Sequence, residues 1–110
     1  MVQYDAVEAY GNPIICDDHD GRIAKYTEAV KLSKKHGSLA ICQLSSPGRQ
    51  GPAHLNPNQP MSASDVKLDK EWAGHSFAKP RPMTQDDIDE LVRRWGETSF
   101  LCHQAGFDGG

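Results

Sequence analysis

The stretch that decides the fold is Ser38–Gln50, with the sequence Ser-Leu-Ala-Ile-Cys-Gln-Leu-Ser-Ser-Pro-Gly-Arg-Gln. Its apolar run begins after Gly37 and ends before a Ser-Pro-Gly turn signal at 46–48, which is typical of a strand buried on both faces. Such strands belong to parallel sheets flanked by helices, and ligands bind at the carboxyl ends of their strands. Gln43 is the polar side chain near that end, so it is the first candidate binding residue.

The length and composition of the chain exclude several classes of protein. The chain has 110 residues, the size of one small domain, with 37% hydrophobic residues and a net charge of -3. It has no basic patch for a nucleic acid, no run of about 18 apolar residues for a membrane span, and no secretory signal pattern at the N-terminus. We therefore expect a cytoplasmic protein with neither nucleic acid nor membrane as a partner.

The candidate metal ligands have simpler interpretations. The three cysteines form no Cys-x-x-Cys or zinc spacing, so we expect reduced thiols. Asp17-Asp18-His19-Asp20 looks like a metal cluster, but it directly precedes a helical pattern, where Asp caps the first N–H groups. Capping is the favoured interpretation, and binding of a metal by these four residues is the minor alternative. His54 and His75 lie in a long loop, where we expect a structural or solvent-facing role.

Two helices flank the predicted strand. The first spans 21–36, with Ile23, Tyr26 and Val30 at the helical interval and Gly37 as its left-handed cap. The second spans 84–105 and begins with a near capping box, Thr84 to Asp87. Its predicted apolar stripe is Ile88, Leu91, Val92, Trp95, Ser99, Cys102 and Ala105.

The remaining connection, 45–83, is long and holds six prolines. A loop of this length inside a compact domain is functional or disordered. Trp72 and Phe77 could anchor a small hairpin, or they could fold the loop onto a neighbour. After the second helix, Phe107-Asp108 is typical of the entry to another strand. One buried parallel strand, 38–44, cannot make a sheet, so we expect the chain to be a slice of a larger α/β fold.

Four motifs resemble one family. Gln-Leu-Ser-Ser-Pro-Gly-Arg-Gln at 43–50 resembles the Gln-Leu-x-His-x-Gly-Arg signature of the Old Yellow Enzyme family, the NADH:flavin oxidoreductases. Cys-Asp-Asp-His-Asp-Gly-Arg at 16–22 resembles the stretch after the second barrel strand in fungal members. Pro-Met-Thr-x-x-Asp-Ile at 82–88 and Ala-Gly-Phe-Asp-Gly at 105–109 resemble the third barrel helix and the start of the fourth strand. The likeness runs in register over nearly all of the chain.

The resemblance implies an FMN-dependent (β/α)8 barrel, a fold of roughly 250 residues, of which residues 1–110 would be one fragment. In such enzymes NAD(P)H reduces the flavin, and the flavin passes a hydride to an activated alkene such as an enone. The fragment would contain the segment after the second strand (1–20), the second helix (21–36), the third strand (38–44), the third βα loop (45–83) and the third helix (84–105).

Gln43 is the one cofactor contact that the resemblance implies, because the family's Gln at this position hydrogen-bonds the edge of the flavin ring. No catalytic residue of the family falls within the fragment. The motif's His is Ser46 here, and we interpret Arg49 as structural because the family holds the flavin phosphate elsewhere.

Two hypotheses remain open. The chain is a truncated segment of a flavin-dependent ene reductase, inactive alone, or it is a non-catalytic remnant that docks or oligomerises through its unpaired strand.

Overall fold

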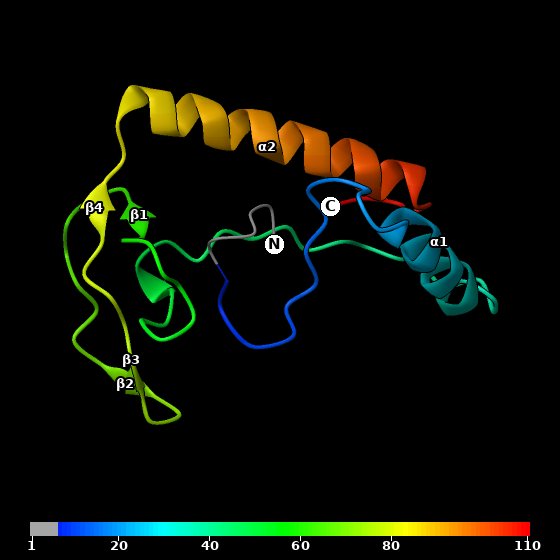
Figure 1. Ribbon diagram of the computed structural model, residues 1–110. Helices are drawn as coiled ribbons and strands as arrows, with labels where there is room; N and C mark the ends of the chain where they lie inside the picture. Colours follow the sequence, from blue (N-terminus) through cyan, green and yellow to red (C-terminus); the bar gives the residue numbers. More distant parts are fainter. Residues whose placement is uncertain (1–6) are drawn as a thin grey trace.

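The computed structural model describes residues 7–110, and its regular structure consists of two helices, one 3-10 turn and four short strands (Figure 1). The two strand pairs lie at one end of the molecule, and α1 lies at the other (Figure 1). The elements are, in chain order, α1 (Arg22–Ser33), η1 (Gly48–Gln50), β1 (Met61–Ser62), β2 (Glu71–Trp72), β3 (His75–Ser76), β4 (Arg81–Pro82) and α2 (Gln85–Gln104).

The long helix α2 connects the two ends of the molecule (Figure 1). Its 20 residues span about 30 Å at 1.5 Å per residue, against a longest molecular dimension of 43 Å. The predicted capping box is present: Thr84 Oγ1 accepts from the Asp87 N–H, and the Asp87 carboxylate accepts from the Thr84 N–H. The start of this helix is therefore set locally, as the sequence predicts.

The apolar stripe of α2 was predicted only in part. Cys102 and Ala105 are buried, but Val92 is 67% exposed and Ile88 is 40% exposed. Thr98 occupies the buried face in place of the expected Ser99, which is exposed. The prediction was wrong at these positions because the described residues cover only one side of the helix.

The first helix is shorter than the predicted 21–36 span. Val30 is its buried residue. Gly37 has the expected positive φ of 86°, but the C-cap is Lys34, so the prediction that Gly37 caps the helix was wrong. Asp18 Oδ1 accepts from the Ile23 N–H at 2.9 Å, so an Asp caps α1 as the sequence predicts.

The prediction of a strand buried on both faces at 38–44 was wrong. Within residues 7–110, this segment forms one isolated parallel bridge, between Ile41 and Gly109, and no regular strand. Leu39 is 75% exposed and Ile41 is 63% exposed. A parallel strand is buried by its two neighbours and by helices on both faces, and residues 7–110 supply only part of these.

The 45–83 connection is more ordered than a plain loop. Strands β1 and β4 pair in parallel, while β2 and β3 form an antiparallel hairpin. The hairpin turns at Ala73 and Gly74, which both have positive φ, 52° and 77°. Of the two alternatives left open for this loop, the small hairpin is therefore present. Trp72 lies in it and is 65% exposed, whereas Phe77 follows it and is buried beside Pro52.

The buried core that residues 7–110 form is small for a chain of this length. Its apolar members are Ile15, Val30, Phe77, Cys102 and Ala105. The radius of gyration is 15.5 Å, whereas a compact domain of this size has about 13 Å. The described residues therefore form an open arrangement of elements rather than a closed core. No helix within residues 7–110 is long and apolar enough to span a bilayer.

Candidate functional site

Gln43 lies at the end of a short parallel pairing between two remote segments. The Cys42 N–H donates to the Gly109 carbonyl and the Asp108 N–H donates to the Ala40 carbonyl, both at 2.8 Å. Gln43 follows directly and is exposed. The pairing places it where the sequence predicts a ligand contact, at the carboxyl end of the 38–44 segment.

Asp108 holds this pairing together, and sequence reasoning did not identify it. Its carboxylate accepts from the Ala40 N–H at 2.9 Å and forms an ion pair with Lys34 Nζ at 2.6 Å. The hydrogen bond from Ala40 and then the one from Lys34 lower the pKa of Asp108 below its usual value. The available signal was its place in the expected strand entry, Phe107-Asp108.

A cavity of about 370 Å³ borders Gln43. Asn12, Tyr26 and Thr98 bring polar groups to its wall, and Leu44 and Phe107 bring apolar surface. Thr98 is 1% exposed, and its Oγ1 is the one buried side-chain oxygen or nitrogen among the described residues without a hydrogen-bond partner. The cavity therefore combines an amide at its rim with a mixed polar and apolar wall.

The lining of this cavity offers an amide for the edge of a flavin ring but no cationic side chain of residues 7–110 for the phosphate of FMN. The Gln43 amide can donate and accept at such an edge. However, no Lys or Arg of the described part of the chain lines the cavity, and Glu8 adds an acidic side chain. A phosphate needs cationic or N–H donors, so its contacts must come from elsewhere.

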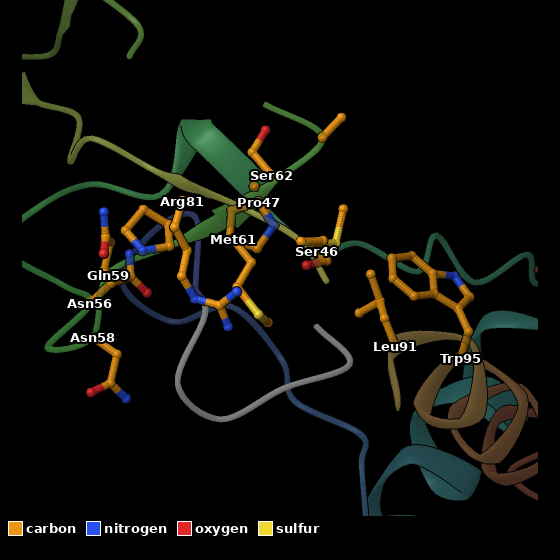
Figure 2. A pocket seen from close by; sticks show the side chains of 14 residues that line it. Ser46, Pro47, Asn56, Asn58, Gln59, Met61, Ser62, Arg81, Leu91 and Trp95 are labelled. Atoms are coloured by element: carbon orange, nitrogen blue, oxygen red, sulfur yellow. The ribbon is translucent and has the colours of Figure 1, made fainter. Parts of the chain in front are cut away.

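A second and larger cavity, of about 520 Å³, lies between the 45–83 connection and α2 (Figure 2). Its wall includes Ser46, the amide side chains of Asn56, Asn58 and Gln59, and Trp95. Figure 2 shows the amides and Trp95 on opposite sides of the cavity. Gln43 does not line it, so the structure separates the predicted flavin contact from the residue that replaces the motif's His.

Arg81 lines the larger cavity, and its guanidinium forms an ion pair with Asp87. Its guanidinium donates to both carboxylate oxygens of Asp87, at 2.6 and 2.8 Å. This fork, followed by hydrogen bonds from Thr84, holds the pKa of Asp87 well below its usual range. Arg81 therefore fastens β4 to the start of α2 and is a poor candidate for an anion ligand.

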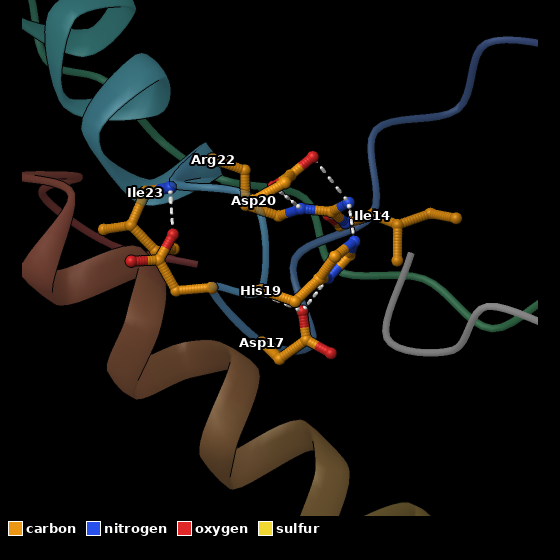
Figure 3. Close-up of polar contacts among 7 residues, drawn as sticks. Ile14, Asp17, His19, Asp20, Arg22 and Ile23 are labelled. Atoms are coloured by element: carbon orange, nitrogen blue, oxygen red, sulfur yellow. Dashed lines mark hydrogen bonds and ion pairs between the residues drawn. The ribbon is translucent and has the colours of Figure 1, made fainter.

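The side chains of the Asp17–Asp20 cluster form hydrogen bonds and ion pairs with nearby residues (Figure 3). Asp17 pairs with His19, and Asp20 pairs with Arg22 at 2.8 Å. Arg22 also donates to the Ile14 carbonyl, and its hydrogen bond with Asp20 lowers the pKa of that carboxyl to about 2. No group of three or more His, Cys, Asp or Glu side chains in residues 7–110 is arranged to hold a metal ion.

The structure brings His54 and His75 together, which the sequence did not predict. Their rings stack with centroids 4.1 Å apart, and Tyr10 lies 5.7 Å from His54. The contact fastens the β2–β3 hairpin to the earlier part of the loop. Both histidines are exposed, so the contact is consistent with the structural or solvent-facing role that was expected for them.

Comparison with known proteins gives a family match over nearly the whole chain. A family model described as the NADH:flavin oxidoreductase / NADH oxidase family matches residues 2–109. The NADH-dependent flavin oxidoreductase nadA of Aspergillus parasiticus is 36% identical over 112 residues, covering 99% of this chain and 25% of that protein. The NADH:acrylate oxidoreductase of Vibrio harveyi is 34% identical over 113 residues, covering 99% of this chain and 11% of that protein.

A solved structure shows the same fold. Morphinone reductase matches with a TM-score of 0.85 at 23% identity, over 97% of this chain and 31% of that chain. The chain therefore has the fold of part of a (β/α)8 barrel, and the predicted fold class is confirmed. The chain spans a quarter or less of the length of these two curated relatives and about a third of the length of the morphinone reductase chain.

Proposed function

Because the chain belongs to the NADH:flavin oxidoreductase / NADH oxidase family, we propose that it is a segment of an FMN-dependent NAD(P)H oxidoreductase of the ene reductase type. When bound, FMN in such an enzyme takes a hydride from NAD(P)H and passes it to an activated alkene. The name of the Vibrio harveyi relative supports this substrate class, since acrylate is an alkene activated by a carboxylate.

The observation that carries the proposal is the position of Gln43. Its amide is exposed at the end of the 38–44 segment and borders the smaller cavity. In this role Gln43 orients the flavin through hydrogen bonds at the ring edge, because an amide offers both a donor and an acceptor. Since the same cavity offers no cation for a phosphate, we expect residues 1–110 alone to be inactive.

A flavin titration of the purified chain tests the second part of the proposal. FMN fluorescence should show no saturable quenching, because only one side of the cofactor finds partners. Saturable binding together with NADH oxidation by the isolated chain would contradict the proposal that it is only a segment.

A chimera tests the role of Gln43. Residues 1–110 would replace the matching segment of the Aspergillus parasiticus relative, to which they align over 99% of their length. We expect the chimera to bind FMN and to oxidise NADH. Gln43→Ala should weaken FMN binding by about tenfold, the effect of losing one or two hydrogen bonds.

Gln104→Ala is the matched control, because Gln104 is an exposed Gln at the end of α2, and it should leave FMN affinity unchanged. Equal FMN affinity in the Gln43 and Gln104 variants of a folded chimera would refute the flavin contact. An absence of FMN binding by a folded chimera would refute the family function for this segment.

A second candidate function is docking without catalysis, and the exposure of the 38–44 segment favours it. Leu39 and Ile41 are both more than half exposed, and among residues 7–110 the 38–44 segment is paired along one edge, through the bridge to Gly109. An open strand edge pairs readily with another chain. Sedimentation of the purified chain over a range of concentrations should then show oligomers or aggregates, whereas a monomer at all concentrations would count against docking.

A further inference from the structure

Two cysteines that lie 60 residues apart in the sequence meet beside the candidate site. Cys42 belongs to the 38–44 segment, and Cys102 lies in the last turn of α2. The Cys102 thiol donates a hydrogen bond to Cys42 Sγ, with the sulfurs 3.4 Å apart. No disulfide is present in residues 7–110, so both side chains are thiols.

The elements that carry these thiols are held against each other. The Cys42 N–H donates to the Gly109 carbonyl, and the chain between Cys102 and Gly109 turns back directly through Gly106, whose φ is 92°. A disulfide has its sulfurs about 2.05 Å apart, so the pair has to close by about 1.4 Å. The approach requires rotation about the χ1 angles of the two cysteines, because each sulfur is joined to its backbone through one rotatable Cα–Cβ bond.

Two cavities reach the cysteine pair. A cavity of about 170 Å³ is lined by both Cys42 and Cys102, and the cavity beside Gln43 also reaches Cys42. Cys42 is half-buried, while Cys102 is 4% exposed. A small oxidant can therefore reach Cys42 first. Cys16 lines neither cavity.

We propose that Cys42 and Cys102 are an oxidative modification site, which a peroxide converts to an intramolecular disulfide joining the 38–44 segment to α2. The inference does not depend on flavin binding. It goes beyond the proposed function because it assigns a second chemistry, thiol oxidation, to residues that take no part in hydride transfer.

The chemistry balances with hydrogen peroxide as the oxidant. Cys42 sulfur attacks the O–O bond, an S–O bond forms, and the departing oxygen leaves as water after taking a proton, so Cys42 becomes a sulfenic acid. Cys102 sulfur then attacks Cys42 sulfur; the S–S bond forms, the S–O bond breaks, and a second water leaves. Two thiols and one peroxide give one disulfide and two waters.

The two thiols have different roles in this sequence. Burial, followed by the hydrogen bond with Cys42, raises the pKa of the Cys102 thiol to about 12. The thiolate is the reactive form, so Cys102 is a poor first nucleophile and the peroxide reacts first at Cys42. Cys102 takes the second step because its sulfur already lies 3.4 Å from the Cys42 sulfur.

The disulfide would lock the segment that carries Gln43. Cys42 and Gln43 are adjacent in the chain, and the cross-link closes a long loop between residues 42 and 102. Closing a long loop removes conformations from the unfolded chain, so the oxidised protein should unfold at a higher temperature than the reduced one.

The experiment is treatment of the purified chain with a small excess of hydrogen peroxide, followed by thiol counting in denaturant and peptide mapping without reduction. The wild type and Cys16→Ser should each lose two thiols and yield one linked peptide pair containing Cys42 and Cys102. Their melting temperature should rise, and dithiothreitol should reverse the rise.

Cys42→Ser and Cys102→Ala serve as the loss-of-function variants, and neither should give the linked peptide or the rise in melting temperature. If removal of buried Cys102 prevents folding, the half-buried Cys42 variant decides the question. Oxidation of the wild type that produces sulfinic acid, links to Cys16 or links between chains, without the Cys42–Cys102 peptide, would overturn the proposal.

Discussion

At the scale of single residues, Asp87 connects the start of helix α2 to strand β4. It completes the capping box of α2 and receives both hydrogen bonds of the Arg81 fork, so one carboxylate fixes the helix start and fastens β4 to it. Only the ionised form can accept all of these hydrogen bonds. The stabilisation at this point is therefore linked to pH.

Asp87→Asn should make the protein less sensitive to acid. The folded pKa of Asp87 lies below its ordinary value, so its contribution to stability is complete above about pH 4 and is lost as the pH falls further. The variant should be less stable at pH 7, and its free energy of unfolding should fall less steeply in acid. Urea unfolding of both proteins at a series of acidic pH values measures this.

Asp86→Asn is the matched control, since Asp86 is exposed in the same first turn of α2. It should keep the acid sensitivity of the wild type. Parallel curves for the Asp87 variant and the wild type would contradict the role assigned to the Arg81 fork.

Single residues also show what sequence reasoning can and cannot find. Gln43 was predicted from its place at the end of an apolar run, and the structure places it beside a cavity. Asp108 and Thr98 were missed because the segments that they face are remote in the chain: Asp108 contacts Ala40, 68 residues distant, and Thr98 lines the same cavity as Gln43. A contact of that separation leaves no local pattern.

At the scale of elements, the β2–β3 hairpin carries an identifiable strain. A two-residue turn with positive φ at both central positions suits Asn-Gly, whereas here the first position is Ala73 with φ of 52°. Left-handed backbone costs a residue with a Cβ roughly 1 kcal/mol, and Asn tolerates it better because its side chain can hydrogen-bond locally.

Ala73→Asn should therefore stabilise the hairpin by a few tenths of a kcal/mol up to about 1 kcal/mol. Amide hydrogen exchange at Trp72 and His75 reports on the hairpin itself, and slower exchange is expected. Ala63→Asn is the control, because Ala63 is exposed and is not among the residues with positive φ. Equal protection of the hairpin in the two variants would contradict the turn assignment.

At the scale of the whole molecule, apolar surface remains open along the 38–44 segment and α2. Leu39 is 75% exposed, and Phe100 on α2 is 61% exposed. In a barrel of this family, neighbouring strands and helices would cover part of this surface. In the isolated chain another copy can do so.

Leu39→Lys should reduce self-association of the chain, because a charge on an open strand edge opposes pairing with another strand. Leu32→Lys is the matched control: Leu32 is 65% exposed, but it lies on α1, away from the bridge at Ile41. Sedimentation should show less oligomer for the Leu39 variant only. An equal decrease in oligomer for both variants would indicate that any added charge improves solubility, and it would contradict pairing through the 38–44 edge.

The sequence by itself determined the two helices, the capping box at Thr84 and the family membership. These depend on short-range periodicity, on hydrogen bonds within one turn and on motifs in register. The tertiary structure alone decided that 38–44 is open rather than buried, that Thr98 and Asp108 belong to the candidate site, and that Cys42 meets Cys102. Each of these depends on which remote segments lie together, and chain order alone does not specify that.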